Sequence, residues 1–262
     1  MESSPSRNRP RPLRVLGSTL GLSILLATLF NLWTPSEGLF AGSFSDKLGL
    51  LLTAQPAAES NFVATPQPQL RIGIVAGHAG NDSGAICRDA NGNVSLTEAD
   101  VNMDIATRVQ KTLTDEGYQV DLLNEFDTRL NGYRAVALVS IHNDSCEYVN
   151  DEATGFKVAA AVNTHDYNRA SRLTECLRDR YQSVTGLRFH EGSITNDMRG
   201  YHAFSEINPN TIAAIIETGF LYLDQDLLVK EPDKVAYGVA QGILCFVRNE
   251  NIEPTPLPTY AP

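Results

Sequence analysis

The chain has 262 residues and a formal net charge of −10 at pH 7, because 31 Asp and Glu outnumber 21 Lys and Arg. This charge excludes nucleic acid as a partner, since phosphate binding needs a basic surface. It also excludes electrostatic attraction as the means of holding an anionic polymer. Any such ligand must be bound by the shape and chemistry of a groove.

The N-terminus has the pattern of a membrane segment. Residues 1–14 are basic, and residues 15–33 form a largely apolar run of about the length that crosses a bilayer as a helix. The positive-inside rule predicts a cytoplasmic N-terminus and an extracytoplasmic remainder. An uncleaved anchor is favoured, because the run is longer than a usual signal-peptide core and no small-x-small site follows closely. Cleavage as a signal segment, with secretion, is the alternative.

Two further stretches have the composition of flexible chain. Residues 34–68 mix Pro, Ser, Ala, Gly and Gln without a sustained period, which predicts a linker with a reach of about 30 Å. Residues 251–262 contain four prolines and are predicted to be a disordered tail. The remaining residues, 69–250, have the size of one domain with a proper core.

Within residues 69–250, apolar β-type runs alternate with amphipathic helical patterns. In chain order, the sequence predicts a strand at 70–76, a helix at 98–116, strands at 118–123, 135–142 and 155–162, a helix at 167–185, a strand at 212–217 and a helix at 233–248. This alternation predicts an α/β fold, a single three-layer domain in which helices flank a mostly parallel or mixed central sheet.

Three of the predicted strands lead directly into a histidine or a glutamate, residue types that are common at catalytic sites. His78, His142 and Glu217 each follow a continuous apolar run of the kind that is buried on both faces of a sheet. In open α/β sheets, reactive groups gather beyond the carboxyl ends of such strands. We therefore expect these three side chains to lie at one edge of the sheet.

A fourth candidate, Glu98, stands where a helix is predicted to begin. Thr97 and Asp100 form a capping-box pattern, and apolar residues then recur at four-residue spacing along one helical face. A carboxylate in the first helical turn is held rigidly and points off the end of the helix. Such a position suits a metal ligand.

The four residue types together indicate a catalytic zinc site. Zinc prefers imidazole and carboxylate ligands, and a catalytic site typically has three protein ligands and one open position. His78, Glu98 and His142 supply such a set, which leaves Glu217 free for proton transfer. Taken singly, each residue has an ordinary explanation as a hydrogen-bonded loop histidine or a glutamate favoured by a helix dipole. Their convergence favours the metal site.

The segments that carry these residues resemble one known family. Residues 70–249 are similar to the zinc-dependent N-acetylmuramoyl-L-alanine amidase family of the amidase 3 type. The similarity lies in Gly-His-Ala-Gly-Asn-Asp-Ser-Gly-Ala at 77–85, Glu-Ala-Asp-Val-Asn at 98–102, Ser-Ile-His-Asn at 140–143 and Glu-Thr-Gly-Phe-Leu at 217–221. The sequence departs from the family pattern at two places: Ala79 stands in place of the family's second glycine, and residues 223–226 match only loosely. These departures leave the metal site intact but put the family's groove shape in doubt for this chain.

The resemblance implies a reaction and a place for it. His78, Glu98 and His142 are implied zinc ligands, and Glu217 is the implied catalytic acid/base. The implied reaction hydrolyses the amide between the lactyl group of N-acetylmuramic acid and L-alanine, which detaches stem peptides from the glycan of bacterial peptidoglycan. Peptidoglycan is then the partner, together with the membrane through the N-terminal segment. The sequence identifies no activator protein.

Four cysteines in an extracytoplasmic protein predict disulfides. Cys87 and Cys146 lie in the loops that follow the two histidines, so they can join if those loops share an edge. Cys176 and Cys245 would then pair between helices. One alternative is four buried thiols that behave as small apolar residues. Another is Cys146 as a zinc ligand, which the absence of any Cys-x-x-Cys pattern weakens.

Arg199 and His202 precede the strand that leads into Glu217 and are candidates for substrate contact. Arginine suits bidentate binding of a carboxylate, such as one in a stem peptide. The alternative is a surface loop with one hydrogen-bonded histidine.

Two other functions fit the same residues. A different zinc-dependent amide hydrolase, such as a carboxypeptidase, uses the same metal chemistry, and it would accept free peptides. A non-catalytic wall-binding protein of the same fold is the second alternative. The presence of all four site residues counts against the second, and absence of bound zinc would favour it.

Overall fold

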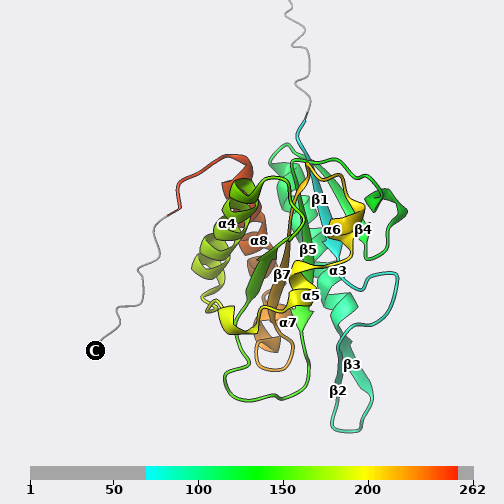
Figure 1. Ribbon diagram of the computed structural model, residues 1–262. Coiled ribbons are helices and arrows are strands. Elements are labelled where there is room, and N and C mark those ends of the chain that lie inside the picture. The colour runs from blue at the N-terminus through cyan, green and yellow to red at the C-terminus, as the bar shows by residue number, and fades with distance from the viewer. Residues whose placement is uncertain (1–68, 253–262) are drawn as a thin grey trace, which may run out of the picture. The chain divides into compact units, whose positions relative to one another are not determined.

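A five-stranded sheet forms the centre of the structure, a computed structural model that describes residues 69–252 (Figure 1). The strand order is β4-β1-β5-β7-β6, and neighbouring strands are parallel except β6 and β7, which are antiparallel. The strands are β1 (Arg71–Ala76), β4 (Gln119–Asn124), β5 (Ala137–Asp144), β6 (Lys157–Ala160) and β7 (Ile212–Phe220). The predicted α/β fold with a mixed central sheet is confirmed.

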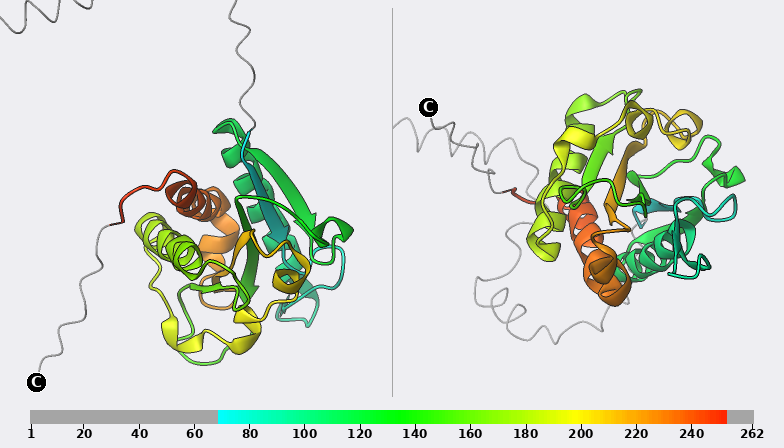
Figure 2. Two further views of the ribbon diagram at one scale, coloured as in Figure 1. Left: turned by 45° about the horizontal axis from the view of Figure 1, so that its top comes forward. Right: turned by 90° about the horizontal axis from the view of Figure 1, so that it is seen from below.

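Three long helices cover one face of the sheet. They are α3 (Glu98–Asp115), α4 (Tyr167–Thr185) and α8 (Pro232–Val247). Helix α8 packs against both α3 and α4 (Figure 2). Alternate residues of the central strands point to this layer, as Ile72 and Ile74 of β1 do, and both are fully buried. Burial on both sides explains why these strands read as continuous apolar runs.

The opposite face of the sheet is covered by shorter elements. The 3-10 helix η1 (Thr128–Leu130), α5 (Asn196–Arg199) and α6 (Ala203–Glu206) form a second core with the other residues of the strands, such as Val75 and Leu138. The remaining elements are a hairpin of β2 (Ile86–Arg88) and β3 (Val94–Thr97), the 3-10 helix η2 (Glu191–Ser193) and α7 (Gln225–Lys230). The sheet is therefore the middle of three layers.

The predicted long elements appear with small changes of boundary. Strands β5 and β7 continue past His142 and Glu217, to Asp144 and Phe220. Both residues therefore lie inside the C-terminal ends of their strands and not in the loops that follow. The predicted strand at 155–162 shortens to β6, because Phe156 and Val162 make backbone hydrogen bonds outside the sheet, to Arg188 and Arg199. The sequence did not indicate the β2–β3 hairpin or the four-residue helices.

The start of α3 follows the predicted capping pattern. Thr97 is the N-cap residue, and its side-chain oxygen accepts a hydrogen bond from the Asp100 backbone N–H at 3.2 Å. Its hydroxyl also donates to Asp100 Oδ2 at 2.6 Å. The cap fixes Glu98 as the first residue of the helix, with its carboxyl group directed at the sheet edge.

Two disulfides join segments that are distant in the sequence. Cys87 of β2 is bonded to Cys146, and Cys176 of α4 is bonded to Cys245 of α8, with Cα–Cα distances of 5.2 and 5.6 Å. This is the pairing that the positions of the loops and helices favoured. The first bond ties the hairpin to the loop after β5, and the second fastens two helices of one layer.

We expect all four cysteines to be bonded in the purified protein. Alkylation without reductant should leave the mass unchanged, whereas alkylation after reduction should add four groups. Reduction of the two bonds should lower the free energy of unfolding by at least about 2–5 kcal/mol, because each reduced bond releases a long loop in the unfolded chain. Urea unfolding with and without reductant measures this change, and modification of all four thiols before reduction would contradict the pairing.

The predicted segments 1–14, 15–33 and 34–68 and most of the predicted tail lie outside the described residues. Within residues 69–252, no helix combines the length and the apolar character needed to span a membrane.

Candidate metal centre

The parallel strands carry the candidate residues to one edge of the sheet, the edge from which the β2–β3 hairpin projects (Figure 1). His78 lies in the turn after β1, His142 is in β5, and Glu98 begins α3. His78 has a φ of 63°, in the left-handed region that non-glycine residues rarely adopt. Such strain is typical of functional positions, where the surroundings hold an unfavourable backbone conformation.

The three side chains form a cluster with the dimensions of a zinc site. One donor atom from each of His78, Glu98 and His142 lies within 4.8 Å of the others. Glu98 Oε1 is 3.4 Å from His78 Nε2 and 3.4 Å from His142 Nδ1. Tetrahedral zinc with bonds of about 2.0–2.1 Å separates its ligand atoms by about 3.3–3.4 Å. The donor set therefore fits zinc in both chemistry and spacing.

Glu98 is buried, and its carboxylate is fixed by the backbone. Oε2 accepts from the Ala85 N–H at 3.0 Å, and Oε1 accepts from the Asn143 N–H at 3.1 Å and from Asn102 Nδ2 at 3.2 Å. Burial opposes its ionisation, but hydrogen bonds from His142 and Ala85 outweigh burial and lower the pKa of Glu98. An ionised carboxylate is the form that binds a metal.

The two histidines are held in different ways. His78 Nδ1 lies 2.6 Å from Asp82 Oδ1, which also accepts from the Gly84 N–H at 2.8 Å. A carboxylate at one ring nitrogen orients the other toward a metal. His142 is buried, which disfavours its charged form, yet hydrogen bonding to Glu98 and the nearby carboxylates raise its pKa. A negative site of this kind favours a bound cation.

Gly77 leaves the space that the His142 ring occupies. A Cβ atom at this position would lie 2.4 Å from His142 Nε2 and Cε1, a distance at which one of the two residues must move. Asn102 Nδ2 also donates to the Gly77 carbonyl at 3.0 Å, which fixes the backbone there. The first glycine of the Gly-His segment is therefore required by close packing against the second histidine.

We expect Gly77→Ala to displace the His142 ring and to lower turnover by about 100-fold, the usual cost of moving a catalytic group by about 1 Å. Gly192→Ala is the matched control, because a Cβ there meets nothing within 4 Å and its φ is not positive. Steady-state kinetics and zinc content of both variants check the prediction. Equal turnover in Gly77→Ala and Gly192→Ala would contradict it.

Glu217 lies beside the cluster; the residue is partly exposed, but its carboxyl oxygen Oε2 is buried. It pairs with His142 across β5 and β7, so the two side chains point to the same face, and its Oε2 has no hydrogen-bond partner among the described residues. Burial raises the pKa of Glu217 to about 7, although the His142 and Lys157 charges act in the opposite direction. A carboxyl group with a pKa near 7 is suited to accept and donate a proton.

Lys157 is a further charged residue next to Glu217. It is opposite Glu217 in the β6–β7 pairing, is 4% exposed, and forms an ion pair with Asp144. Its ammonium group also lies 5.3 Å from the centre of the Phe220 ring. The sequence analysis missed Lys157 and Asp144, because only the pairing of β5, β6 and β7 brings them next to Glu217.

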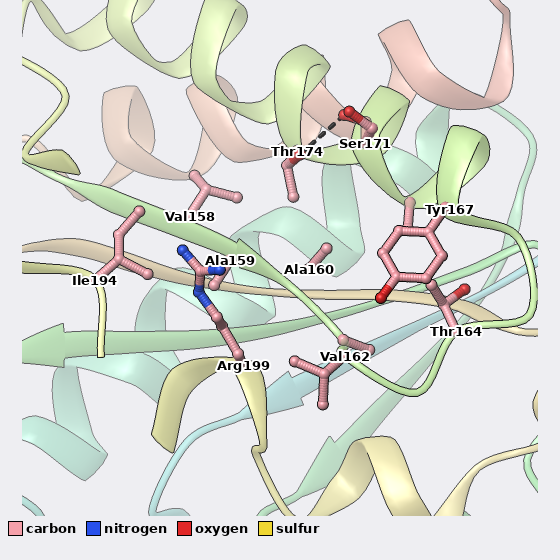
Figure 3. Close-up of a pocket in the computed structure, with 12 residues that line it drawn as sticks. Val158, Ala159, Ala160, Val162, Thr164, Tyr167, Ser171, Thr174, Ile194 and Arg199 are labelled. Atoms are coloured by element: carbon pink, nitrogen blue, oxygen red, sulfur yellow. Dashed lines mark hydrogen bonds between the residues drawn. The ribbon is translucent and has the colours of Figure 1, made fainter. Parts of the chain in front are cut away.

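Arg199 and His202 occupy different places. Arg199 points into a groove along the free edge of β6, between α4 and Ile194 (Figure 3), and within residues 69–252 it forms no ion pair. His202 lies next to Glu125, the residue that follows β4, and its ring nitrogens contact Glu125 Oε1 at 3.0 Å and Glu206 Oε1 at 2.8 Å. The structure thus joins the four principal residues and leaves Arg199 in a separate groove.

A parallel sheet edge that gathers two histidines and two glutamates defines an α/β protein with a candidate metal-hydrolase site. Residues 72–245 match the family model described as N-acetylmuramoyl-L-alanine amidase, Amidase_3. Because this match spans well over half of the chain, the chain belongs to that family. It is accordingly a hydrolase that acts on peptidoglycan, at the amide between N-acetylmuramic acid and L-alanine.

Solved structures have the same fold. An N-acetylmuramoyl-L-alanine amidase from Clostridium difficile 630 matches with a TM-score of 0.54 and 23% identity, over 71% of this chain and 100% of its own. AmiC2 of Nostoc punctiforme matches with a TM-score of 0.51 and 22% identity, over 68% and 97%. The CwlD amidase of Clostridioides difficile, solved in complex with the GerS lipoprotein, matches with 0.52 and 19%, over 69% and 100%. No curated protein sequence matches the chain significantly.

Proposed function

We propose that the chain is a zinc-dependent amidase in which His78, Glu98 and His142 hold the metal and Glu217 transfers the proton. The observation that carries the proposal is the pair of 3.4 Å separations around Glu98 Oε1, which suit tetrahedral zinc. When bound, zinc supplies a Lewis acid that polarises the lactyl carbonyl and activates water. The protein supplies the geometry and the proton transfer.

Each protein group has a defined task in this reaction. Glu217 accepts a proton from the attacking water and returns it to the alanine nitrogen, which then leaves as a neutral amine. Lys157 stands across the strand pair from Glu217, where its positive charge favours the ionised carboxylate that must act as base. Asp82 holds the His78 ring, so that its other nitrogen keeps facing Glu98.

The reaction is proposed to take place outside the cytoplasm, next to a membrane. Peptidoglycan is an extracytoplasmic substrate, and the basic segment 1–14 followed by the apolar run 15–33 supports an anchored protein. The linker 34–68 would then let residues 69–250, the proposed catalytic domain, reach nearby wall. Secretion after cleavage of residues 15–33 is the alternative.

Product analysis tests the proposed reaction. The full chain is incubated with a defined disaccharide–tetrapeptide muropeptide, and the products are identified by mass spectrometry. An amidase releases an intact peptide with a free alanine amine and a disaccharide with a lactyl carboxylate. Release of a single C-terminal amino acid would instead indicate a carboxypeptidase. An unchanged muropeptide that stays bound would indicate a non-catalytic wall-binding protein.

A further inference from the structure

A buried carboxylate that the proposed reaction does not use lies behind the metal centre. Glu125 directly follows β4 and is 6% exposed. Its Oε2 accepts a hydrogen bond from the His78 backbone N–H at 2.8 Å and lies 3.7 Å from His142 Nε2. One side chain therefore contacts the backbone of His78 and, at the ring nitrogen that does not face Glu98, the side chain of His142.

The second oxygen of Glu125 is tied to a histidine outside the cluster. His202 Nε2 lies 3.0 Å from Glu125 Oε1, and His202 Nδ1 lies 2.8 Å from Glu206 Oε1. The His202 ring stacks on Phe126, with 4.2 Å between ring centroids. The Glu125 N–H donates to the Ala79 carbonyl at 3.1 Å. Both oxygens of the Glu125 carboxylate are therefore held, Oε2 by the His78 N–H and Oε1 by the His202 ring, and these contacts join distant parts of the chain.

The His142 ring has one nitrogen that still needs an acceptor. Its Nδ1 faces Glu98 Oε1 at 3.4 Å, on the metal side, whereas Nε2 is buried and has no hydrogen-bond partner among the described residues. A histidine that binds metal through one nitrogen usually donates its other N–H to a carboxylate, a carbonyl or water. Glu125 Oε2 faces this nitrogen, and a shift of less than about 1 Å brings it into hydrogen-bond range.

We propose that Glu125 is a positioning residue of the metal centre, which fixes the ring of His142 and the backbone of His78, and that His202 holds Glu125 in place. This inference rests on the proposed zinc site. It gives His202 a role in supporting the metal centre, in addition to the substrate contact that its sequence position suggested. His78 and His142 then each have a carboxylate behind them, Asp82 for the first and Glu125 for the second.

Zinc affinity of the full chain tests this role, because a purely structural carboxylate would affect folding but not metal binding. Glu125→Gln keeps the size of the side chain and removes its charge. We expect its zinc affinity, measured by competition with a chromophoric chelator, to fall about 10- to 100-fold. The visible absorption of the Co²⁺-substituted protein should also change. Glu175→Gln, on the exposed surface of α4, is the matched control with unchanged affinity.

A second variant keeps the test decisive if Glu125→Gln does not fold. His202→Phe retains a ring next to Phe126 at a partly exposed position and removes both hydrogen bonds of the histidine. We expect a smaller loss of zinc affinity than in Glu125→Gln. Wild-type affinity in whichever variants fold would overturn the proposed role of Glu125 and leave the zinc site standing. Failure of the unmodified chain to bind zinc would overturn both proposals.

Discussion

Glu217→Gln is expected to lower kcat by about 10²- to 10⁴-fold, the usual contribution of a positioned general acid/base. The substitution keeps the shape of the side chain but removes the group that accepts and returns the proton. Zinc content should stay at the wild-type level, because Glu217 is outside the proposed ligand set. Kinetics with a defined muropeptide, together with metal analysis of the same preparation, check both parts. Near-normal turnover would contradict the role of Glu217.

The same variant makes an independent prediction about stability. Burial raises the pKa of Glu217 from 4.5 to about 7, so folding favours its protonated form. Its contribution to the stability of the metal-free protein is fully present below pH 4.5 and is lost as the pH rises through 7. The glutamine in Glu217→Gln does not ionise, so the variant does not lose stability in this way as the pH rises. In the metal-free state, the variant should therefore gain up to about 3 kcal/mol relative to wild type between pH 5 and pH 8.

Urea unfolding at the two pH values measures this gain, with Glu175→Gln as a control that should show none. A gain in stability together with a loss of turnover would show that the lost activity does not come from misfolding. Such a trade-off is typical of catalytic groups, which are held in surroundings that do not favour their charged state. Equal pH dependence in wild type and Glu217→Gln would contradict the raised pKa.

Glu98→Gln is expected to abolish stable zinc binding, and turnover with it. Both oxygens of Glu98 accept hydrogen bonds, Oε2 from Ala85 and Oε1 from Asn143 and Asn102. A glutamine amide group must turn its NH₂ toward one of these donors, which leaves at least one hydrogen bond unmade in a buried place. The proposed zinc site would also lose its only anionic ligand. We expect a loss of about 1–3 kcal/mol in stability in addition to the loss of metal.

Metal analysis after dialysis separates this outcome from that of Glu217→Gln. The Glu98 variant should carry little zinc, whereas the Glu217 variant should carry as much as wild type. Stoichiometric zinc in Glu98→Gln would show that Glu98 is not a ligand. Loss of zinc in both variants would show that Glu217 belongs to the ligand set and has no separate role as the base.

The places of the principal side chains at one edge of the sheet could be predicted, because the sequence patterns that indicate them are short and local. His142 and Glu217 end apolar runs that are long enough to identify buried parallel strands, and parallel strands place their carboxyl ends at one edge. Glu98 follows a capping residue whose pattern extends over four positions, and the cap forms as expected. In each case, a short stretch of sequence determines both the element and the place of the residue on it.

The supporting residues could not be predicted because their contacts join distant parts of the chain. Glu125 contacts His78 across 47 residues and His202 across 77. In the sequence it is one acidic residue after a strand, with no pattern of its own. Lys157 is a similar case, since a lysine in a short strand is usually exposed, and only the pairing of β6 with β7 buries it. Tertiary packing alone assigns these residues to the site.

The short elements were missed for a related reason. Helices α5 and α6 have four residues each, which is too few to show a helical period. The β2–β3 hairpin turns at Asp89, whose carbonyl accepts from Gly92, and its strands have three and four residues. Such elements depend on the surrounding core. They nevertheless matter, because α6 begins just after His202 and the hairpin carries Cys87.

Metal dependence of the reaction is the most direct test of the central proposal, that the His78, Glu98 and His142 cluster holds the zinc that drives amide hydrolysis. Release of peptide from the defined muropeptide is followed before chelation, after chelation with metal removal verified by elemental analysis, and after addition of one equivalent of zinc. We predict that release stops on chelation and recovers with zinc in wild type, but does not recover in Glu98→Gln. Undiminished release from verified metal-free protein would contradict the account.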